Sequence, residues 1–283
     1  SWSKAIQLPG SITTTTTPSL LYDQGILYMA YQGLDGQIYF SLSPDSGQTW
    51  SEPSGTNLYS ANGVALTTYL GNAAIFFPNS STNEIVCALS TTPLPTDPAN
   101  WGDFTWSDYT EIVNPNAFGT PGPISAVNVN GTANVTGTVC LAYPSLNSSD
   151  LDFVSGQINF DQFNDPVLLT GNPAASAANL FSDGTQVYLS YIADGGAINL
   201  QALPLVLNGG NGGIWLGTPQ TISNQSSNYA PSGTVVNSQI YLAYAGENQN
   251  LYVTGLGNPS LSQSLYGNGS NVQVLGDVNG DGF

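Results

Sequence analysis

The stretch Ile26-Leu27-Tyr28-Met29-Ala30-Tyr31 decides the fold, because versions of it recur along the whole chain. Each version is an apolar run that ends in an aromatic residue and is bordered by turns rich in Gly, Asn and Asp. The other copies are Ala74-Ile75-Phe76-Phe77, Val139-Cys140-Leu141-Ala142-Tyr143, Val187-Tyr188-Leu189-Ser190-Tyr191 and Ile240-Tyr241-Leu242-Ala243-Tyr244. None of these runs favours a helix, so the chain is predicted to be a repeat protein built from β-strands.

The terminal aromatic residues of the five runs follow one another at intervals of 46, 66, 48 and 53 residues. Intervals of this size are typical of the four-stranded blades of a β-propeller. In the first repeat, the remaining strands are expected at residues 18–22, 37–42 and 49–51, with hairpin turns at 23–25 and 34–36. The sequence therefore predicts an all-β fold with five blades, and a six-bladed ring is the alternative.

The fifth repeat lacks a fourth strand that contains Trp, and the N-terminus offers one. The opening Ser1-Trp2-Ser3-Lys4 resembles Thr49-Trp50-Ser51 of the first repeat. We therefore expect the N-terminal strand to complete the last blade and close the ring, which would remove an exposed sheet edge. The propeller would occupy residues 1–255, and residues 256–283, rich in Gly, Ser and Asn, would form a strap or linker.

The charge balance restricts the possible partners. The 283 residues include 18 acidic side chains, a single Lys or Arg and no His, for a formal net charge of −17. A basic surface for nucleic acid or anionic lipid cannot be built from this composition. No apolar run approaches the roughly 18 residues of a membrane-spanning helix, so membrane insertion is not expected. A surface of Ser, Thr, Asn, Gln and Gly with few basic residues favours a secreted or cell-surface protein.

Cys87 and Cys140 are the two cysteines, and both lie in apolar runs. They are either buried free thiols or a disulfide between neighbouring blades, and the sequence does not decide between the two. Because the chain has no His, neither a catalytic Cys–His pair nor a Ser-His-Asp triad is available.

One hairpin carries a specific motif: Ser43-Pro44-Asp45-Ser46-Gly47-Gln48-Thr49-Trp50 matches the pattern S-x-D-x-G-x-T-W. It resembles the Asp-box hairpin of sialidase-like β-propellers and related sugar-binding propellers. In that family the box is structural, because the Asp satisfies donors of the turn and the Gly adopts a conformation that other residues avoid. The motif covers one hairpin only, and the other blades depart from it. Sialidases bind the substrate carboxylate with arginines, and this chain has none, so the residues argue against sialidase activity.

Two further classes of function stay open besides binding. A glycoside hydrolase acting on neutral polysaccharide would need paired carboxylates at the channel. The expected inner strands, at residues 19–21, 64–67, 124–127, 176–179 and 232–235, contain no Asp or Glu. A structural or adhesion module of a surface protein is the other alternative.

The leading hypothesis is a secreted, non-catalytic, lectin-like module that binds neutral glycans. Tyr rings can stack on a pyranose, and short polar side chains can meet its hydroxyl groups. The turns after the recurring aromatic residues supply the candidate ligand-binding residues, which are Tyr31, Asp35, Asn83, Tyr191, Asp194, Tyr244, Glu247 and Asn248. For each of them the alternative is an ordinary role, as a packed Tyr or a hairpin residue.

The C-terminus carries a candidate metal motif. Asp277, Asn279 and Asp281, followed by Gly282, match the opening of a D-x-[DN]-x-[DN]-G calcium loop. The motif resembles the loops of dockerin modules and of calcium-binding, integrin-like propeller repeats. This resemblance implies calcium as a ligand and an additional C-terminal module in the full-length protein.

Overall fold

The computed structural model describes residues 9, 13–14, 16–23, 25–69, 71–94, 97, 105–107, 110–111, 122–129, 138–145, 151–157, 162–163, 167–169, 178–184, 186–203, 219–227, 229–246, 251–256 and 262–263. In this part of the chain the secondary structure is β-strand except for one 3-10 turn, η3 (Asp194–Gly196). The predicted all-β fold is thus confirmed. No helix in these residues is long and apolar enough to cross a membrane.

The described strands form five antiparallel sheets, numbered here in chain order. Sheet 1 contains β1 (Ser19–Asp23), β2 (Ile26–Gln32), β3 (Gln37–Ser43) and β4 (Ser54–Tyr59). Sheet 2 contains β5 (Ala65–Tyr69), β6 (Asn72–Pro78), β7 (Ile85–Pro93) and β8 (Thr110–Glu111). Sheet 3 contains β9 (Ser125–Val129), β10 (Thr138–Pro144), β11 (Leu151–Gln157), β12 (Gln162–Phe163) and β13 (Val167–Leu169). Sheet 4 contains β14 (Asn179–Ser182), β15 (Val187–Ile192), β16 (Ala197–Leu203) and β17 (Gln220–Ser226), and sheet 5 contains β18 (Ser232–Val236), β19 (Gln239–Ala245), β20 (Leu251–Leu256) and β21 (Ser262–Gln263).

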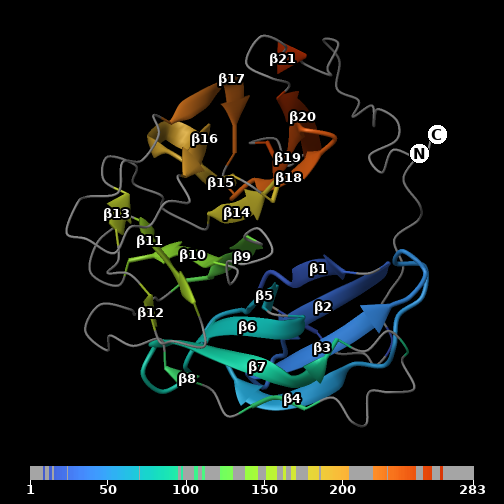
Figure 1. Ribbon diagram of the computed structural model, residues 1–283. Helices are drawn as coiled ribbons and strands as arrows, with labels where there is room; N and C mark the ends of the chain where they lie inside the picture. Colours follow the sequence, from blue (N-terminus) through green and yellow to red (C-terminus); the bar gives the residue numbers. More distant parts are fainter. Residues whose placement is uncertain are drawn as a thin grey trace.

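The five sheets are arranged around a common centre, and the first strand of each lies innermost (Figure 1). These inner strands are β1, β5, β9, β14 and β18, and each pairs with the recurring apolar run that follows it. The repeat read from the sequence therefore corresponds to one sheet. The number of blades in the whole chain stays a prediction, because the described residues give the five sheets and not the complete ring.

A repeated hydrogen bond joins each inner strand to the next. A side-chain oxygen of one inner strand accepts the backbone N–H of its neighbour, at 2.8–3.0 Å. The pairs of acceptor and donor residues are Ser19 with Leu66, Thr67 with Asn128, Ser125 with Leu180, and Asn179 with Gly233. Each bond satisfies a backbone donor that no strand partner reaches, so this contact fixes the spacing of the sheets at the centre.

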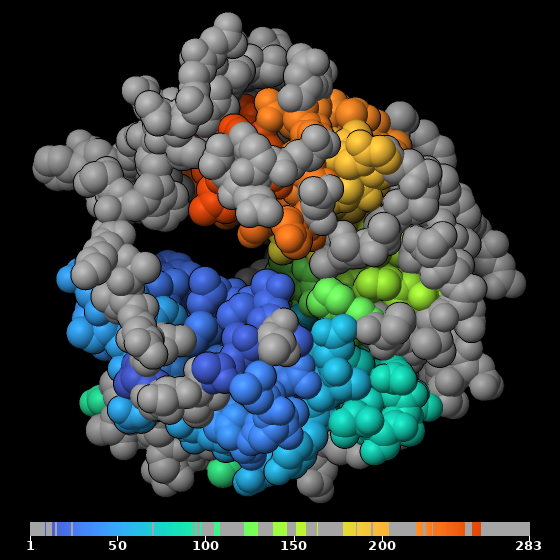
Figure 2. All heavy atoms as spheres, turned by 180° about the vertical axis from the view of Figure 1, so that it is seen from behind, coloured from blue at the N-terminus to red at the C-terminus, as the bar shows by residue number. Residues whose placement is uncertain are grey.

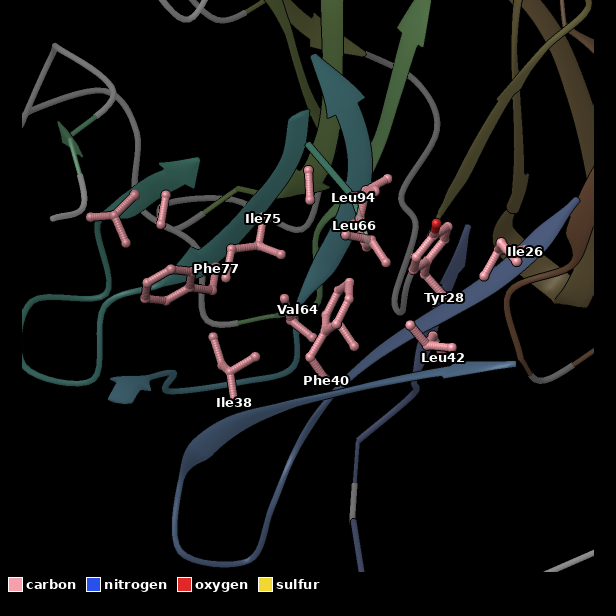
Figure 3. Packing of buried hydrophobic residues seen from close by; sticks show 14 residues of the cluster. Ile26, Tyr28, Ile38, Phe40, Leu42, Val64, Leu66, Ile75, Phe77 and Leu94 are labelled. Atoms are coloured by element: carbon pink, nitrogen blue, oxygen red, sulfur yellow. The ribbon is translucent and has the colours of Figure 1, made fainter. Parts of the chain in front are cut away.

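Apolar side chains fill the space between neighbouring sheets. Four buried clusters join sheet 1 to sheet 2, sheet 2 to sheet 3, sheet 3 to sheet 4 and sheet 4 to sheet 5. Figure 3 shows the first cluster, in which Tyr28, Phe40 and Leu42 of sheet 1 point toward Leu66 and Ile75 of sheet 2. Because both faces of an interior sheet are covered in this way, nearly every residue of an apolar run is buried.

The described sheets do not form a closed ring. Leu20 and Tyr22 of β1 are 61% and 67% exposed, whereas Leu66 and Leu180, at the positions of Leu20 in β5 and β14, are each 4% exposed. Figure 2 shows an open hollow between sheet 1, in blue, and sheet 5, in orange and red. Ring closure was expected from the N-terminal residues 1–8, which lie outside the described residues, so closure stays a prediction.

Two strand assignments need correction. The fourth strand of sheet 5 is β21, which follows β20 in the chain, so the fifth repeat does have an outer strand of its own. This strand belongs to the segment 256–283 that we assigned to a strap. In sheet 1 the outer strand is β4, and not residues 49–51. Trp50 and Ser51 instead belong to the long connection between β3 and β4, where the Ser51 N–H donates to the Leu42 carbonyl over 2.9 Å.

The S-x-D-x-G-x-T-W hairpin has the internal hydrogen bonds expected of a structural turn. Asp45 accepts from the backbone N–H of Thr49 at 2.8 Å, from the Thr49 hydroxyl at 2.6 Å and from the Ser43 hydroxyl at 2.9 Å. The hydrogen bond from the Thr49 hydroxyl is the largest cause that lowers the pKa of Asp45. Gly47 lies in the left-handed region with φ 87°. The carboxylate is therefore engaged by its own turn.

Cys87 and Cys140 are buried free thiols, which decides between the two alternatives that the sequence left open. Burial raises the pKa of Cys140 to about 12 and the pKa of Cys87 still further. Since the thiolate is the reactive form, we expect both cysteines to be inert in the native state.

Titration with Ellman's reagent should detect no thiol in buffer and two thiols per chain in denaturant. Rapid labelling of either cysteine in buffer would contradict this packing.

Candidate functional site

A cavity of about 490 Å³ lies at the centre of the molecule, where the five inner strands begin. All five sheets contribute to its wall. Its described lining consists of Thr17, Pro18, Ser19, Leu20, Val64, Ala65, Leu66, Pro123, Ile124, Ser125, Ala126, Ala178, Asn179, Leu180, Tyr229, Ala230, Pro231, Ser232 and Gly233. None of these lining residues carries a charge, so the cavity is a neutral surface of mixed polar and apolar character.

The polar groups of this wall come from equivalent positions of the inner strands. Ser19, Ser125 and Asn179 each accept a hydrogen bond from the next inner strand, as described above. A serine hydroxyl that accepts one bond still has its O–H to donate, and the asparagine amide has two N–H groups. Ser232 occupies the same register position in β18, opposite Ala243, and is exposed. The inner strands thus present hydrogen-bonding groups that are held in place by the sheets.

Tyr229 is the aromatic residue among the described residues that line the cavity. It lies in the connection between sheet 4 and sheet 5 and is 63% exposed. The buried hydroxyl of Ser227 holds this connection, because it accepts from the Tyr229 N–H at 3.0 Å and donates to the Tyr229 carbonyl at 2.7 Å. The Ser190 hydroxyl binds the Pro231 carbonyl at 3.1 Å from the neighbouring strand β15. The ring is therefore exposed on a backbone that is well anchored.

This arrangement suits the binding of a neutral polyhydroxylated ligand. An exposed Tyr ring offers a flat apolar face, and the surrounding hydroxyl and amide groups offer hydrogen bonds. General acid–base chemistry needs a titratable group within hydrogen-bond reach of the ligand. The described lining contains no carboxylate, His, Cys or Lys, so it offers a ligand none of these acid–base groups.

The three tyrosines proposed from the sequence lie in the core. Tyr31, Tyr191 and Tyr244 are at most 3% exposed. Burial, as the largest cause, raises the pKa of Tyr31 to about 12 and also raises the pKa of Tyr191. Tyr31 stacks on Tyr39 with ring centroids 5.8 Å apart, and Tyr244 stacks on Tyr252 at 5.5 Å. These rings offer no open face in this structure.

Two of the proposed polar residues are exposed on turns. Asp35 lies in the β2–β3 turn and accepts the Tyr39 hydroxyl at 2.8 Å. Asn83 lies in the β6–β7 turn with φ 59°, and its N–H donates to the Asn79 carbonyl at 2.9 Å. The structure brings Asp35 close to Tyr39, which stacks on Tyr31. Their role in binding a glycan stays a prediction.

The side chains of the remaining candidates lie outside the part of the chain that the structure describes. Asp194 opens the 3-10 turn η3, and only its backbone is described. Glu247 and Asn248 lie outside the described residues, as do the proposed metal ligands Asp277, Asn279 and Asp281. In the part of the chain that the structure describes, no group of three or more Cys, Asp or Glu side chains is placed to hold a metal ion. Calcium binding therefore stays a prediction for the C-terminal loop.

Sequence reasoning missed Tyr229 and the polar positions of the inner strands. A signal for them exists in the sequence: a Pro precedes the first polar residue in Pro18-Ser19, Pro123-Ile124-Ser125 and Pro231-Ser232. Pro ends the connection from the preceding sheet, and the Ser that follows begins the inner strand.

Comparisons with known proteins identify the fold. No family model matches the chain, and no curated protein is similar in sequence. Among solved structures, a mutant form of AofleA from Arthrobotrys oligospora matches with a TM-score of 0.63 and 11% identity, over 89% of this chain and 72% of that chain. SapL1 lectin in complex with alpha methyl fucoside matches with a TM-score of 0.57 and 12% identity, over 85% of this chain and 76% of that chain.

An enzyme is also similar. The exo-beta-1,3-galactanase from Phanerochaete chrysosporium, solved with beta-1,3-galactotriose, matches with a TM-score of 0.53 and 13% identity. The match covers 84% of this chain and 60% of the galactanase chain. The matched structures include propellers. At these identities the likeness concerns the fold alone, and together with the five sheets around one centre it shows that this chain is a β-propeller.

Proposed function

We propose that this chain is a carbohydrate-binding propeller that recognises neutral glycans in its central cavity and does not cleave them. One observation carries the proposal: the cavity of about 490 Å³ is lined by uncharged residues of all five sheets, with the exposed ring of Tyr229 at its wall. A pyranose would stack on this ring, and Ser19, Ser125, Asn179 and Ser232 would meet its hydroxyl groups.

The net charge of the chain supports a neutral ligand. At −17, the protein repels anionic glycans over the range of a Debye length, about 8 Å at physiological ionic strength. The described cavity wall has no Lys or Arg that would compensate a carboxylate or sulfate. Neutral sugars are not repelled by this charge and need no basic side chain to compensate them. We therefore expect hexoses or deoxyhexoses without acidic groups as ligands.

The structural neighbours give general support for a sugar-related role. SapL1 is described as a lectin and was solved with alpha methyl fucoside, and the galactanase was solved with galactotriose. A glycoside hydrolase remains the competing function, since enzymes of this class share the fold. Hydrolysis would require two carboxylates separated by about 5–9.5 Å around the sugar. The described wall of the cavity has none, which favours binding without cleavage.

Secretion and calcium are part of the same proposal. A polar surface with a single basic residue suits an extracellular lectin. Asp277, Asn279 and Asp281 would bind calcium, and none of them is among the described lining residues of the cavity. Calcium is accordingly not needed for glycan binding in this proposal.

A glycan array screened with the wild-type chain and with Tyr229→Ala tests the proposal. The wild type should bind a narrow set of neutral glycans, with chelator and without it. The Tyr229→Ala variant should bind them at least about tenfold more weakly, because loss of a stacking face costs on the order of 1.5 kcal/mol. Tyr22→Ala is the matched control, since Tyr22 is as exposed but does not line the cavity. A blank array would refute glycan binding, and equal binding by Tyr229→Ala would refute the cavity as the site.

A further inference from the structure

We infer that the outer edge of sheet 1 carries a second site for neutral sugars, formed by Tyr59, Asp35, Gln37 and Asn57. The choice of a sugar as the ligand rests on the proposed function, but the site itself is separate from the cavity. Tyr59 ends β4, and its cross-strand partner in β3 is Gln37. Asp35 lies in the turn that precedes β3. The four residues thus meet where one turn and two strand ends come together.

Tyr59 provides the aromatic face of this edge site. Its side chain is 51% exposed, so the ring is open to a ligand. Residues opposite each other in antiparallel strands have Cβ atoms about 5 Å apart, so the Tyr59 side chain starts next to that of Gln37. Tyr59 is also close enough to Tyr39 to contribute to the raised pKa of Tyr39. The equivalent position of sheet 4, opposite Ala197, is Ser226. An aromatic ring is therefore not required at this position by the packing of the fold.

The polar groups beside the ring are joined to one another. Asp35 Oδ1 accepts the Gln37 N–H at 3.1 Å, and Asp35 Oδ2 accepts the Tyr39 hydroxyl at 2.8 Å. Gln37 Nε2 donates to Asn57 Oδ1 at 3.2 Å. Each carboxylate oxygen can accept a further hydrogen bond, and the two N–H groups of the Asn57 amide can donate. The edge site thus offers both acceptors and donors to a pair of vicinal hydroxyl groups.

The backbone around these groups is held in a special conformation. Asn57 has φ 60°, although it lies within a strand, and the register between β3 and β4 shifts between Gln37 and Tyr39. Left-handed residues other than Gly concentrate at functional positions. The β2–β3 turn is fixed to the end of β4 by the Ser60 N–H, which donates to the Gly36 carbonyl at 2.9 Å. The side chains are therefore oriented before a ligand arrives.

The chemistry of the edge selects a neutral polyol. A carboxylate that already accepts two hydrogen bonds repels anions, and the described edge has no basic side chain to offset it. A sugar hydroxyl, in contrast, donates a charge-assisted bond to the Asp35 carboxylate. Tyr39 acts as a positioning residue, because its hydroxyl donates to Asp35 Oδ2. That hydrogen bond to Asp35 is also the largest cause that raises the pKa of Tyr39.

Native mass spectrometry of the full chain with β-1,3-galactotriose, cellotriose and maltotriose tests the second site. For any sugar that binds, we expect two bound molecules for the wild type, one for Tyr59→Ala, one for Tyr229→Ala and none for the double variant. Tyr59→Phe should keep two, since it retains the ring. Asp35→Asn should weaken the edge site by about tenfold or more, because it removes a charged acceptor. Tyr22→Ala is the control with two bound molecules, and thermal unfolding verifies that each variant is folded.

The outcomes separate the two proposals. One bound molecule in the wild type that Tyr59→Ala retains, or two in Tyr59→Ala, would overturn the edge site and leave the cavity site standing. Loss of binding in Tyr59→Ala with no change in Tyr229→Ala would support the edge site and overturn the cavity. If none of the three sugars binds to the wild type at millimolar concentration, the edge site as stated is overturned. A positive glycan array would then still support the cavity.

Discussion

Replacing Phe40 with Ala is expected to lower the free energy of unfolding by about 3–5 kcal/mol. Phe40 is fully buried in the cluster that joins sheet 1 to sheet 2 (Figure 3). Its ring meets the edge of Trp106 with centroids 5.6 Å apart and lies 6.1 Å from the ring of Tyr28. Removal of the ring loses this burial and leaves a cavity. The surrounding strands cannot move in to fill it, because hydrogen bonds to their partner strands hold them in place.

Urea denaturation followed by circular dichroism measures this change, and Leu34→Ala is the matched control. Leu34 is a large apolar residue of the same sheet, but it is 68% exposed on a turn, so its loss should change the free energy of unfolding by no more than about 0.5 kcal/mol. A loss below about 1 kcal/mol for Phe40→Ala would mean that sheets 1 and 2 do not pack through this cluster.

The second large effect is expected for Gly233→Ala. A Cβ atom at position 233 would lie 2.1 Å from Cε1 of Phe181, far inside the contact distance of two carbon atoms. Phe181 cannot turn aside freely, because it is buried between sheets 4 and 5 and stacks on Tyr188 at 5.4 Å. The clash should also strain the hydrogen bond from the Gly233 N–H to Asn179. We expect a loss of about 1–3 kcal/mol or more in the free energy of unfolding.

A compensating substitution tests the stated cause. Phe181→Leu is smaller at the point of contact, so the double variant Gly233→Ala with Phe181→Leu should be more stable than additivity of the two single changes predicts. Ser232→Ala serves as a control in the neighbouring, exposed position and should have little effect. Equal stability of Gly233→Ala and the wild type would show that β18 does not approach β14 as described.

Much of the fold was predictable because the repeat can be recognised from the recurring apolar runs. The runs that end in Tyr31, Phe77, Tyr143, Tyr191 and Tyr244 correspond to β2, β6, β10, β15 and β19, the second strand of each sheet. The inner strands were also placed within a few residues. These strands could be recognised without an alternation of apolar and polar residues, since the strands of a sheet that is covered on both faces are apolar on both sides.

The outer strands could not be assigned in the same way. They pair on one side only, and in sheets 2, 3 and 5 they are only two or three residues long. Tertiary packing rather than local pattern decides where they begin. In sheet 1, Trp50 suggested an outer strand at residues 49–51. These residues instead belong to the connection that follows β3, and the strand that pairs with β3 is β4, which comes after them. The two-residue strand β21 has no sequence signal at all.

The candidate site was harder to predict than the fold. A Tyr at the end of an apolar run has the same sequence pattern whether it packs between sheets or faces solvent, so the sequence could not decide between the two for Tyr31, Tyr191 and Tyr244, which are buried. Tyr229 lies between two repeats and belongs to no periodic pattern. The cavity is formed by strand ends that are far apart in the chain, which only the arrangement of the sheets brings together.

The most direct test of glycan binding without cleavage is the mass of the complex formed between the wild-type chain and a neutral oligosaccharide from the array. After a long incubation, native mass spectrometry should find the protein with the intact oligosaccharide bound, and no shorter sugar in solution. Such a result would identify the propeller as a binding module. Release of shorter sugars would contradict the account by identifying a hydrolase, and the absence of any complex would contradict glycan binding itself.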